Sequence, residues 1–414
     1  MIPLAHVVHE LLAERTRLLL TVLAIAWGTA SVTTMLALGE GLRLTFARSD
    51  RGMGEGIVIV WPGQTSKAYG GLPEGYPVRL VPDDIDLLRR AIPEMASLSG
   101  EGNAYPQLRH GERFRSSRVM GVHPDYGEMR HILPVAGGRF IDPIDLAQRR
   151  RVAVIGPQVA KELYGEGSDP VGQTLEIAGR EFTVVGVMQR KFQTSTYGGP
   201  DRDGTWIPIT TFQLLFDRRD YANLVAKPKR PEDMQAMQQQ LREVIARRRG
   251  LNPEDKELLN IWDTQEQQRV TGLVFGGLQI VLGVVGGLTL VVAGVGIANV
   301  MYVSVSGATR DIGIRVAVGA RSWQVLGQYV LEGLLATGVG GALGLAATHA
   351  LVKLVDQIPM EGEFFTFVGR PVPVLSSQVA LIVIGLLGLV GLLAGFFPAR
   401  RAAQVDPAEA LRHD

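Results

Sequence analysis

Charged residues are absent from four long stretches of the chain. Leu18–Gly39, Thr271–Thr309, Gly333–Val352 and Pro371–Ala399 contain no Asp, Glu, Lys or Arg, and the shortest of them has 20 residues. A helix of about 20 apolar residues is long enough to cross the hydrocarbon core of a bilayer. The pattern therefore predicts an α-helical membrane protein with four transmembrane helices, which we place at 18–39, 271–306, 322–355 and 377–399.

The segment between the first two runs, residues 40–270, has a mixed pattern that predicts a large extracytoplasmic α/β domain inserted between helices 1 and 2. Short apolar runs at 56–62, 151–156 and 205–210 indicate strands, and 174–188 indicates a hairpin that turns at Ala178-Gly179. Amphipathic segments that open with proline or with acidic or polar residues indicate helices at 82–92, 156–165 and 231–250. We expect an inserted lobe at about 130–205.

The second apolar run is too long for a bilayer. Its 39 residues would form a helix of roughly 58 Å, against a hydrocarbon thickness of about 30 Å. Arg310 fixes the cytoplasmic end of this helix, so residues 271–280 are expected to extend beyond the membrane as a stalk. The end of the first helix is the expected partner of this stalk.

Glycines four residues apart recur in the apolar runs. Such pairs let two helices approach closely, and we expect helix packing at Gly283, Gly287, Gly340, Gly344, Gly391 and Gly395.

Lys and Arg near the helix ends predict the orientation of the chain, because positive residues favour the cytoplasmic side. The loop at 356–376 has one arginine against Asp356, Glu361 and Glu363, which favours the opposite side. We therefore place an interfacial helix (1–17), the segment 307–321 and the tail (400–414) in the cytoplasm. The arginines concerned are Arg15, Arg17, Arg310, Arg315, Arg321, Arg400, Arg401 and Arg412.

The cytoplasmic segment 307–321 is amphipathic, and its apolar stripe continues into the third helix. The stripe comprises Ile312, Val316, Trp323, Leu326 and Val330; Gln324, Gln328 and the arginines fall outside it. Gly319-Ala320 predicts a helix end, with Ser322 as the next N-cap. From the residues alone, two interpretations stay open: an ordinary interfacial turn, or an element that transmits a conformational change.

The sequence contains no recognisable constellation of catalytic residues. The sequence has no P-loop, no H-E-x-x-H, no G-x-S-x-G and no cysteine, so thiolate and Cys-type zinc chemistry are excluded. A net charge of +1 argues against a nucleic-acid partner, which would need a basic surface. Within the apolar runs only His349 is ionisable, with Glu332 at a boundary, so no polar path through the helices is expected. The pattern favours a protein that transmits conformation.

Three segments resemble the MacB/FtsX-type permeases of ABC transporters, the mechanotransmission class. Residues 303–333, VSVSGATRDIGIRVAVGARSWQVLGQYVLEG, resemble the family's motif between its second and third helices. Residues 137–188 resemble the MacB periplasmic core domain, and FPARRAAQVDPAEALRHD (397–414) resembles the usual C-terminus. Two departures from the family lie at the ATPase contact that the resemblance implies: the family often has Thr-Glu-Arg where this chain has Ser306-Gly307-Ala308, and Glu where it has Asp311.

The resemblance implies a permease subunit in the bacterial inner membrane, with both termini cytoplasmic and the large domain periplasmic. It implies no cofactor on this chain and no enzymatic activity, because ATP and Mg belong to a separate ABC ATPase subunit. Further implied partners are a second permease copy, a periplasmic adaptor, an outer-membrane channel and the lipid bilayer. The implied ATPase-coupling residues are Arg310, Asp311, Ile312, Gly313, Ile314, Arg315, Ala317, Gly319, Ala320 and Arg321, with Glu332 at the start of the third helix and a C-terminal motif of Pro398, Arg400, Arg401, Pro407, Ala410 and Leu411.

The implied function is efflux of drugs, peptides or similar substrates from the periplasm. Lipoprotein extraction and an FtsX-like regulation of cell-wall hydrolases are alternatives within the class. A membrane-anchored enzyme or sensor is the alternative outside it, and the absence of a catalytic constellation argues against an enzyme.

Overall fold

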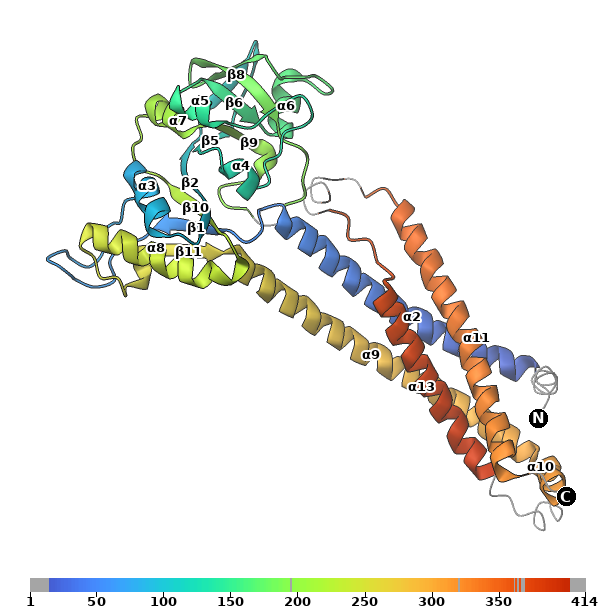
Figure 1. Cartoon of the computed structure of the whole chain (residues 1–414). Coiled ribbons are helices and arrows are strands. Elements are labelled where there is room, and N and C mark those ends of the chain that lie inside the picture. The colour runs from blue at the N-terminus through green and yellow to red at the C-terminus, as the bar shows by residue number, and fades with distance from the viewer. Residues whose placement is uncertain are drawn as a thin grey trace. The chain divides into compact units, whose positions relative to one another are not determined.

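The computed structural model describes residues 15–193, 196–318, 321–360, 362, 365 and 369–402 (Figure 1). The chain divides into two compact units. The helix unit comprises residues 1–45, 272–361 and 370–414, and the α/β domain comprises 46–271 and 362–369. The expected interfacial helix at 1–17 lies almost entirely outside the described residues.

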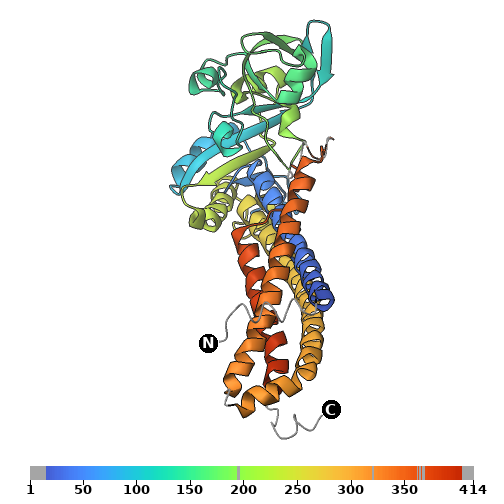
Figure 2. The ribbon, with the colours of Figure 1, turned by 90° about the vertical axis from the view of Figure 1, so that its right-hand side faces the viewer.

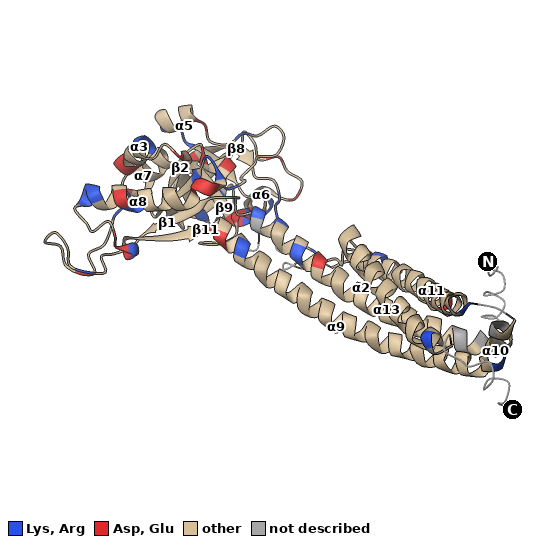
Figure 3. Ribbon diagram, turned by 60° about the horizontal axis from the view of Figure 1, so that its bottom comes forward, with Lys and Arg blue, Asp and Glu red and all other residues tan. Residues whose placement is uncertain are grey.

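The helix unit is built from long helices. They are α2 (Arg15–Arg51), α9 (Thr264–Gly307), α11 (Ser322–Gln357) and α13 (Ser377–Ala402), with the short α10 (Thr309–Ala317) between α9 and α11. Within the described residues four helices, α2, α9, α11 and α13, are long and apolar enough to cross a membrane. Figure 3 shows that charged residues are sparse along them.

Two of these helices are longer than the apolar runs predicted. α2 continues past Gly39 to Arg51, and α9 begins at Thr264, before the run that starts at Thr271. Glu, Arg, Leu and Gln are good helix formers, so the change from apolar to mixed composition does not end either helix. Both helices therefore contribute residues to both units.

A buried apolar cluster joins the helices of the helix unit. Ile25 and Val32 of α2, Leu290 and Ile297 of α9, and residues of α11 and α13 belong to it. Figures 1 and 2 show α11 and α13 running side by side.

The α/β domain contains one mixed sheet of eleven strands in its described part, in the order β11-β1-β10-β2-β5-β9-β6-β8-β7-β3-β4. Pairing is antiparallel throughout except for β5 with β9 and β6 with β8. The strands are β1 (Val58–Pro62), β2 (Met95–Ala104), β3 (Gln107–His110), β4 (Arg113–Ser116), β5 (Arg118–Val122), β6 (Val152–Ile155), β7 (Thr174–Ile177), β8 (Arg180–Val187), β9 (Gly204–Pro208), β10 (Asn223–Pro228) and β11 (Leu259–Asp263).

Several strands of this sheet, among them β5, β6 and β9, are buried on both faces, so alternate residues of one strand can enter different cores. Val58 and Val60 of β1 belong to one core, whereas Ile57 and Ile59 belong to the other. Four helices contribute to the first core: α3 (Pro82–Ala91), α6 (Pro157–Tyr164), α7 (Ile209–Phe216) and α8 (Met234–Arg249). The second core includes Met53, just after α2, and residues of α4 (Tyr126–Met129). The remaining short helices are α5 (Pro143–Ala147), η1 (Asp201–Asp203), η2 (Pro231–Asp233) and η3 (Lys256–Leu258).

The structure tests the hairpin and one of the strands that the sequence predicts for this domain. The hairpin turn at Ala178-Gly179 is confirmed, since both residues have positive φ, 48° and 76°, as a type I′ turn requires. The strand expected at 205–210 is too long, because α7 already begins at Ile209. The lobe at about 130–205 stays a prediction; β6, β7 and β8 from this range are neighbours in the sheet of β9 and β3.

The buried histidine of this domain should make its stability depend on pH. Burial lowers the pKa of His123 to about 4, whereas an unfolded histidine titrates near 6.5. The folded state therefore loses roughly 3 kcal/mol as the pH falls from about 6.5 to 4, because the unfolded chain binds the proton first. A His123→Asn variant, whose amide can still accept from the Gly100 N–H that now bonds Nδ1 at 3.1 Å, should lack this dependence. Thermal unfolding of both full-length proteins at pH 7.5, 5.5 and 4.5 checks this; parallel declines would contradict it.

Candidate functional site

The junction between α9, α10 and α11 contains most of the predicted coupling residues. α9 ends at Gly307, a poor helix former, and α10 begins two residues later. The Thr309 hydroxyl donates to Ser306 O at 2.8 Å and to Val305 O at 3.1 Å, so it satisfies carbonyls that the end of α9 leaves without helical partners.

α10 has a buried face and an exposed face. Ile312 is 4% exposed and belongs to the cluster that includes Val305, Val325 and Ala399 of the three neighbouring long helices; Gly313 is also buried. On the other face, Ile314 is 44% exposed and Val318, just beyond the helix, is 85% exposed. Arg310, Ala317 and Arg321 are exposed as well.

Arg310, Ile314, Ala317 and Val318 lie three or four residues apart along α10 and its last turn, where the Val318 N–H still donates to Ile314 O at 3.1 Å, so they share one side of the helix. We name these four residues the α10 face; Arg321 is exposed too, but it is the N-cap of α11 and does not belong to this face. The α10 face combines the exposed apolar side chains of Ile314 and Val318 with one arginine, Arg310, which suits a groove that is apolar at its centre and acidic at its rim. The side chains of Asp311, Arg315 and Val316 and the whole of Gly319 and Ala320 lie outside the described residues.

The start of α11 differs from the prediction in three ways. Ser322 is not the N-cap, because it is the first helical residue and Arg321 takes the capping position; the Arg321 N–H donates to Gln324 Oε1 at 3.1 Å. Trp323 is 65% exposed and so leaves the predicted apolar stripe. Gln328, expected outside the stripe, is buried, because the stripe turns with α11 rather than continuing from α10.

The remaining predicted residues lie at the ends of α11 and α13. Glu332 is half-buried on α11. Pro398 lies inside α13 and is buried, whereas Arg400 is exposed. The side chain of Arg401, and Pro407, Ala410 and Leu411 entirely, lie outside the described residues.

The predicted packing glycines behave differently from one another. A Cβ at Gly340 would meet Ile25 Cβ at 2.7 Å and one at Gly344 would meet Ala26 O at 2.6 Å, so α11 approaches α2 closely there. A Cβ at Gly391 would overlap Thr337 Oγ1, and one at Gly395 would meet Val330 Cα at 3.2 Å, so α13 approaches α11 equally closely.

The pair on α9 makes no comparable contact within the described chain. A Cβ at Gly283 would meet only Leu36 Cδ2 at 4.0 Å, and nothing lies within 4 Å of one at Gly287. Gly286, which the spacing argument did not select, is the close neighbour of α2: its Cβ would meet Val32 Cγ1 at 2.8 Å.

A polar contact that the sequence reasoning missed ties α2 to α9. Glu40 accepts two hydrogen bonds from Arg43, at 2.9 and 2.7 Å, and one from Gln279 Nε2 at 2.8 Å. The Glu40 side chain is only 9% exposed. The only sequence signal was a carboxylate directly after an apolar run, and Gln279 lies within an uncharged run.

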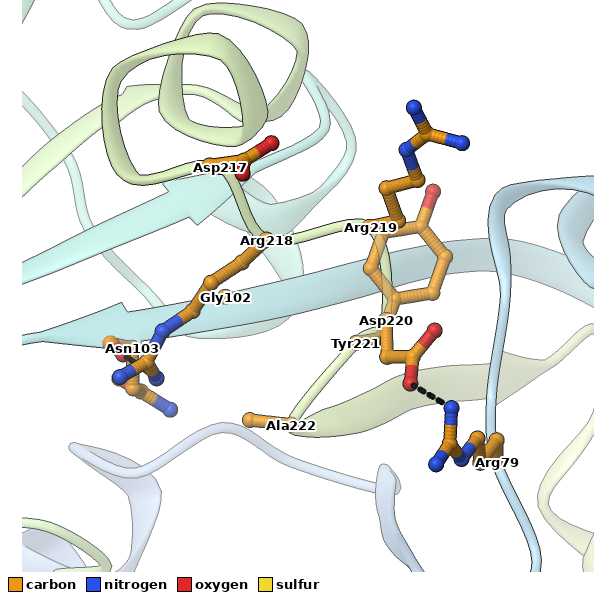
Figure 4. A pocket seen from close by; sticks show the side chains of 9 residues that line it. All are labelled: Arg79, Gly102, Asn103, Asp217, Arg218, Arg219, Asp220, Tyr221 and Ala222. Atoms are coloured by element: carbon orange, nitrogen blue, oxygen red, sulfur yellow. Dashed lines mark hydrogen bonds and ion pairs between the residues drawn. The ribbon is translucent and has the colours of Figure 1, made fainter.

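The α/β domain has a polar pocket of about 690 Å³ between β2 and the segment that precedes β10. Figure 4 shows that its arginines do not converge on one point. Arg218 donates to Asn103 O at 3.0 Å, and Arg79 pairs with Asp220 at 3.8 Å. Because these charges already have partners, the pocket lacks the convergent polar groups of a dedicated ligand site. Among the described residues, no group of three or more His, Cys, Asp or Glu could hold a metal ion.

A second feature that the sequence reasoning missed is a buried ionic cluster around Asp201. Arg130 Nη2 donates to both carboxylate oxygens at 3.1 Å, Lys191 Nζ lies 2.8 Å from Oδ2, and Arg118 Nη2 lies 3.3 Å from Oδ1. Asp201 and Arg130 are fully buried. Burial alone would raise the pKa of Asp201, but Arg130, Lys191 and Arg118 outweigh it and hold that pKa at about 2. Burial lowers the pKa of Lys191 to about 8.

Comparison with protein families finds two matches that together cover most of the chain. Residues 18–244 match the MacB-like periplasmic core domain. Residues 283–407 match the FtsX-like permease C-terminal region.

Similar proteins include the macrolide export ATP-binding/permease protein MacB of Bdellovibrio bacteriovorus, 29% identical over 98% of this chain and 61% of that protein. The proteins of the same name from Chlorobium luteolum and Rhodospirillum rubrum are 31% and 32% identical over 98% and 97% of this chain, and over 59% of each relative. The chain thus spans about three fifths of these relatives. Among solved structures, the periplasmic region of MacB from Actinobacillus actinomycetemcomitans is 16% identical, with a TM-score of 0.43 over 53% of this chain and 94% of that one.

Proposed function

This chain belongs to the family of ABC transporter permeases that join a MacB-like periplasmic core domain to an FtsX-like permease region, and on that premise we propose that it converts ATP binding and hydrolysis into movement of its α/β domain. Within the 414 residues there is no P-loop sequence, so the proposal assigns ATP and Mg to an ABC ATPase outside them. The permease region itself then acts mechanically rather than enzymatically.

The α10 face is the observation that carries this proposal. Ile314 and Val318 are exposed apolar residues on the same side as Arg310, on a helix whose opposite side is buried among the long helices. A partner that binds this face can move α10 only by moving those helices with it, because Ile312 packs in their common core. We propose that the ATPase binds here, although this chain has Gly307 and Ala308 where the family often has Glu and Arg.

The remaining assignments follow the family. We propose a location in the bacterial inner membrane with both termini in the cytoplasm and the α/β domain in the periplasm, and assembly of two copies. The named relatives export macrolides, and we propose efflux of drugs, peptides or similar substrates from the periplasm with an adaptor and an outer-membrane duct.

Charge placed on the α10 face should uncouple ATP hydrolysis from export. In Ile314→Asp and Val318→Asp, a carboxylate replaces an apolar contact with the ATPase, and we expect the permease-dependent stimulation of ATP hydrolysis to fall about tenfold or more, as for loss of a central interface residue. The measurement compares ATPase activity and export in proteoliposomes that contain the full-length protein and its co-purified ATPase. Ile312→Asp should instead reduce the amount of folded protein, because it buries the charge.

Leu214→Asp is the matched control, since Leu214 is 64% exposed on α7 of the α/β domain. It should leave both activities unchanged. Purification in mild detergent without any ATPase, or export that survives both α10 substitutions, would overturn the proposal. Release of lipoproteins or activation of a cell-wall hydrolase in place of export would favour the alternatives within the class.

A further inference from the structure

The last residue of α2 and the two residues after it lie between two segments of the α/β domain. His131 Nδ1 lies 2.8 Å from Arg51 O, and Arg130 Nη1 donates to Met53 O. On the other side, a Cβ at Gly52 would overlap Phe192 O. Residues 51–53, which we name the α2 exit, are therefore held between the residues after α4 and a segment that we name the strap, the described part of 189–203.

The start of α9 is attached elsewhere in the same domain. Thr264 Oγ1 donates to Ile57 O at 2.9 Å and accepts from Ile57 N at 3.1 Å. β11, which directly precedes α9, pairs with β1 along five residues. α9 is thus joined to the β1–β11 edge of the sheet.

The strap connects the α2 exit to the other half of the sheet. Lys191 Nζ donates to Arg130 O at 2.7 Å, and the Asp201 N–H donates to Gln193 Oε1 at 3.0 Å. Arg118, on β5, donates to Tyr197 O and to Asp201, and β9 begins directly after η1. Arg130 is the one described side chain of the cluster around Asp201 that contacts both this cluster and the α2 exit.

We propose that Arg130 is a positioning residue that passes movement of α2 to the β5–β9 half of the sheet, whereas α9 moves the β1–β11 edge. This inference rests on the proposed function. α2 and α9 are attached to different strands of one sheet. Movement of one helix relative to the other should therefore displace one half of the sheet relative to the other half. The halves meet at β2 and β5, which pair over only three residues, Gly102–Ala104 with Val119–Gly121.

Two substitutions in one cluster separate this role from ordinary stability. Arg130→Met removes the bond to Met53 O but leaves Asp201 paired with Arg118 and Lys191. Arg118→Met removes the same charge from a nearly equally buried position. It leaves the α2 exit untouched and leaves Asp201 joined to β9 through η1. Arg130→Lys keeps the charge and serves as the rescue variant, and it remains testable if Arg130→Met does not fold.

The chain has no cysteine, so spin labels can be placed on engineered cysteines in the full-length permease with its ATPase. Arg48→Cys, at the end of α2, and Gln267→Cys, at the start of α9, are each paired with Glu181→Cys on β8; all three positions are exposed. In the parent, a non-hydrolysable ATP analogue should shift the 267–181 distance and leave the 48–181 distance narrow. In Arg130→Met the 48–181 distribution should broaden and export per ATP hydrolysed should fall about fivefold or more; Arg118→Met should retain both parental values and Arg130→Lys should lie between.

The possible failures are distinguishable. If no distance in the parent responds to nucleotide, the proposed function fails whatever Arg130 does. The proposed positioning role of Arg130 is wrong if the parent responds to nucleotide and Arg130→Met shows the parental distances and export. It is also wrong if Arg118→Met loses coupling to the same extent as Arg130→Met, because Arg130 would then have only a structural role.

Discussion

Leucine at Gly344 should separate α11 from α2 and leave little folded protein. A Cβ there would lie 2.6 Å from both Ala26 O and Thr29 Cβ, and backbone cannot move aside as a flexible side chain can. One turn further on, the Thr348 hydroxyl donates to Ala30 O at 3.3 Å across the same contact between α11 and α2. Separation of the two helices would break this hydrogen bond. Overpacking typically costs about 1–3 kcal/mol, and a backbone clash belongs at or above the upper end of that range.

The measurement is the yield of monodisperse full-length protein in mild detergent and its melting temperature, which should fall by about 5 °C or more. Gly338→Leu is the matched control: it is the same substitution on the same helix, at a position where nothing lies within 4 Å of the new Cβ. It should melt like the parent. Equal losses in the two variants would show that any leucine disturbs α11, and parental behaviour of Gly344→Leu would show that the α2–α11 contact is dispensable.

The helix unit was largely predictable because its signal is carried by consecutive residues. A run without charges identifies a helix that can span a membrane wherever its partners lie, and all four runs correspond to such helices in the described chain. The same reasoning could not find where those helices end. Glu40 stops the apolar run but not α2, since helix ends depend on caps and tertiary contacts rather than on polarity.

Contacts between residues that are far apart in the sequence could not be predicted either, because they too depend on tertiary packing. Nothing near Asp201 in the sequence indicates that Arg130, 71 residues earlier, will donate to both its oxygens. Spacing selected Gly283 and Gly287 on α9, yet Gly286 is the residue against Val32, because the relative rotation of two helices decides which glycine faces the neighbour. The α10 face was within the predicted coupling segment, but separating Ile312 from Ile314 required the packing of three other helices.

Alanine at Asp201 should destabilise the α/β domain more than any other single loss of a charge in its described part. Three buried or nearly buried cations would keep their positions without the carboxylate that compensates them. Removing one partner of a buried ion pair costs about 3–5 kcal/mol. Asp203→Ala is the matched control two residues away: Asp203 pairs with Arg115 at 3.1 Å but is 31% exposed, and such pairs contribute about 0–1 kcal/mol.

The pH dependence of the destabilisation by Asp201→Ala shows whether loss of the carboxylate charge causes it. Because the pKa of Asp201 is lowered to about 2 from its usual 3.8, the ionised form stabilises the fold fully above about pH 4, and this contribution is lost as the pH falls towards 2. Hydrogen exchange of β5 and β9 amides in the full-length protein should therefore show a gap between parent and Asp201→Ala that is constant from pH 7 to 5 and narrows below 4. A gap that persists undiminished at pH 2 would assign the loss to packing, since by then most of the stability that the ionised carboxylate contributes to the parent has been lost.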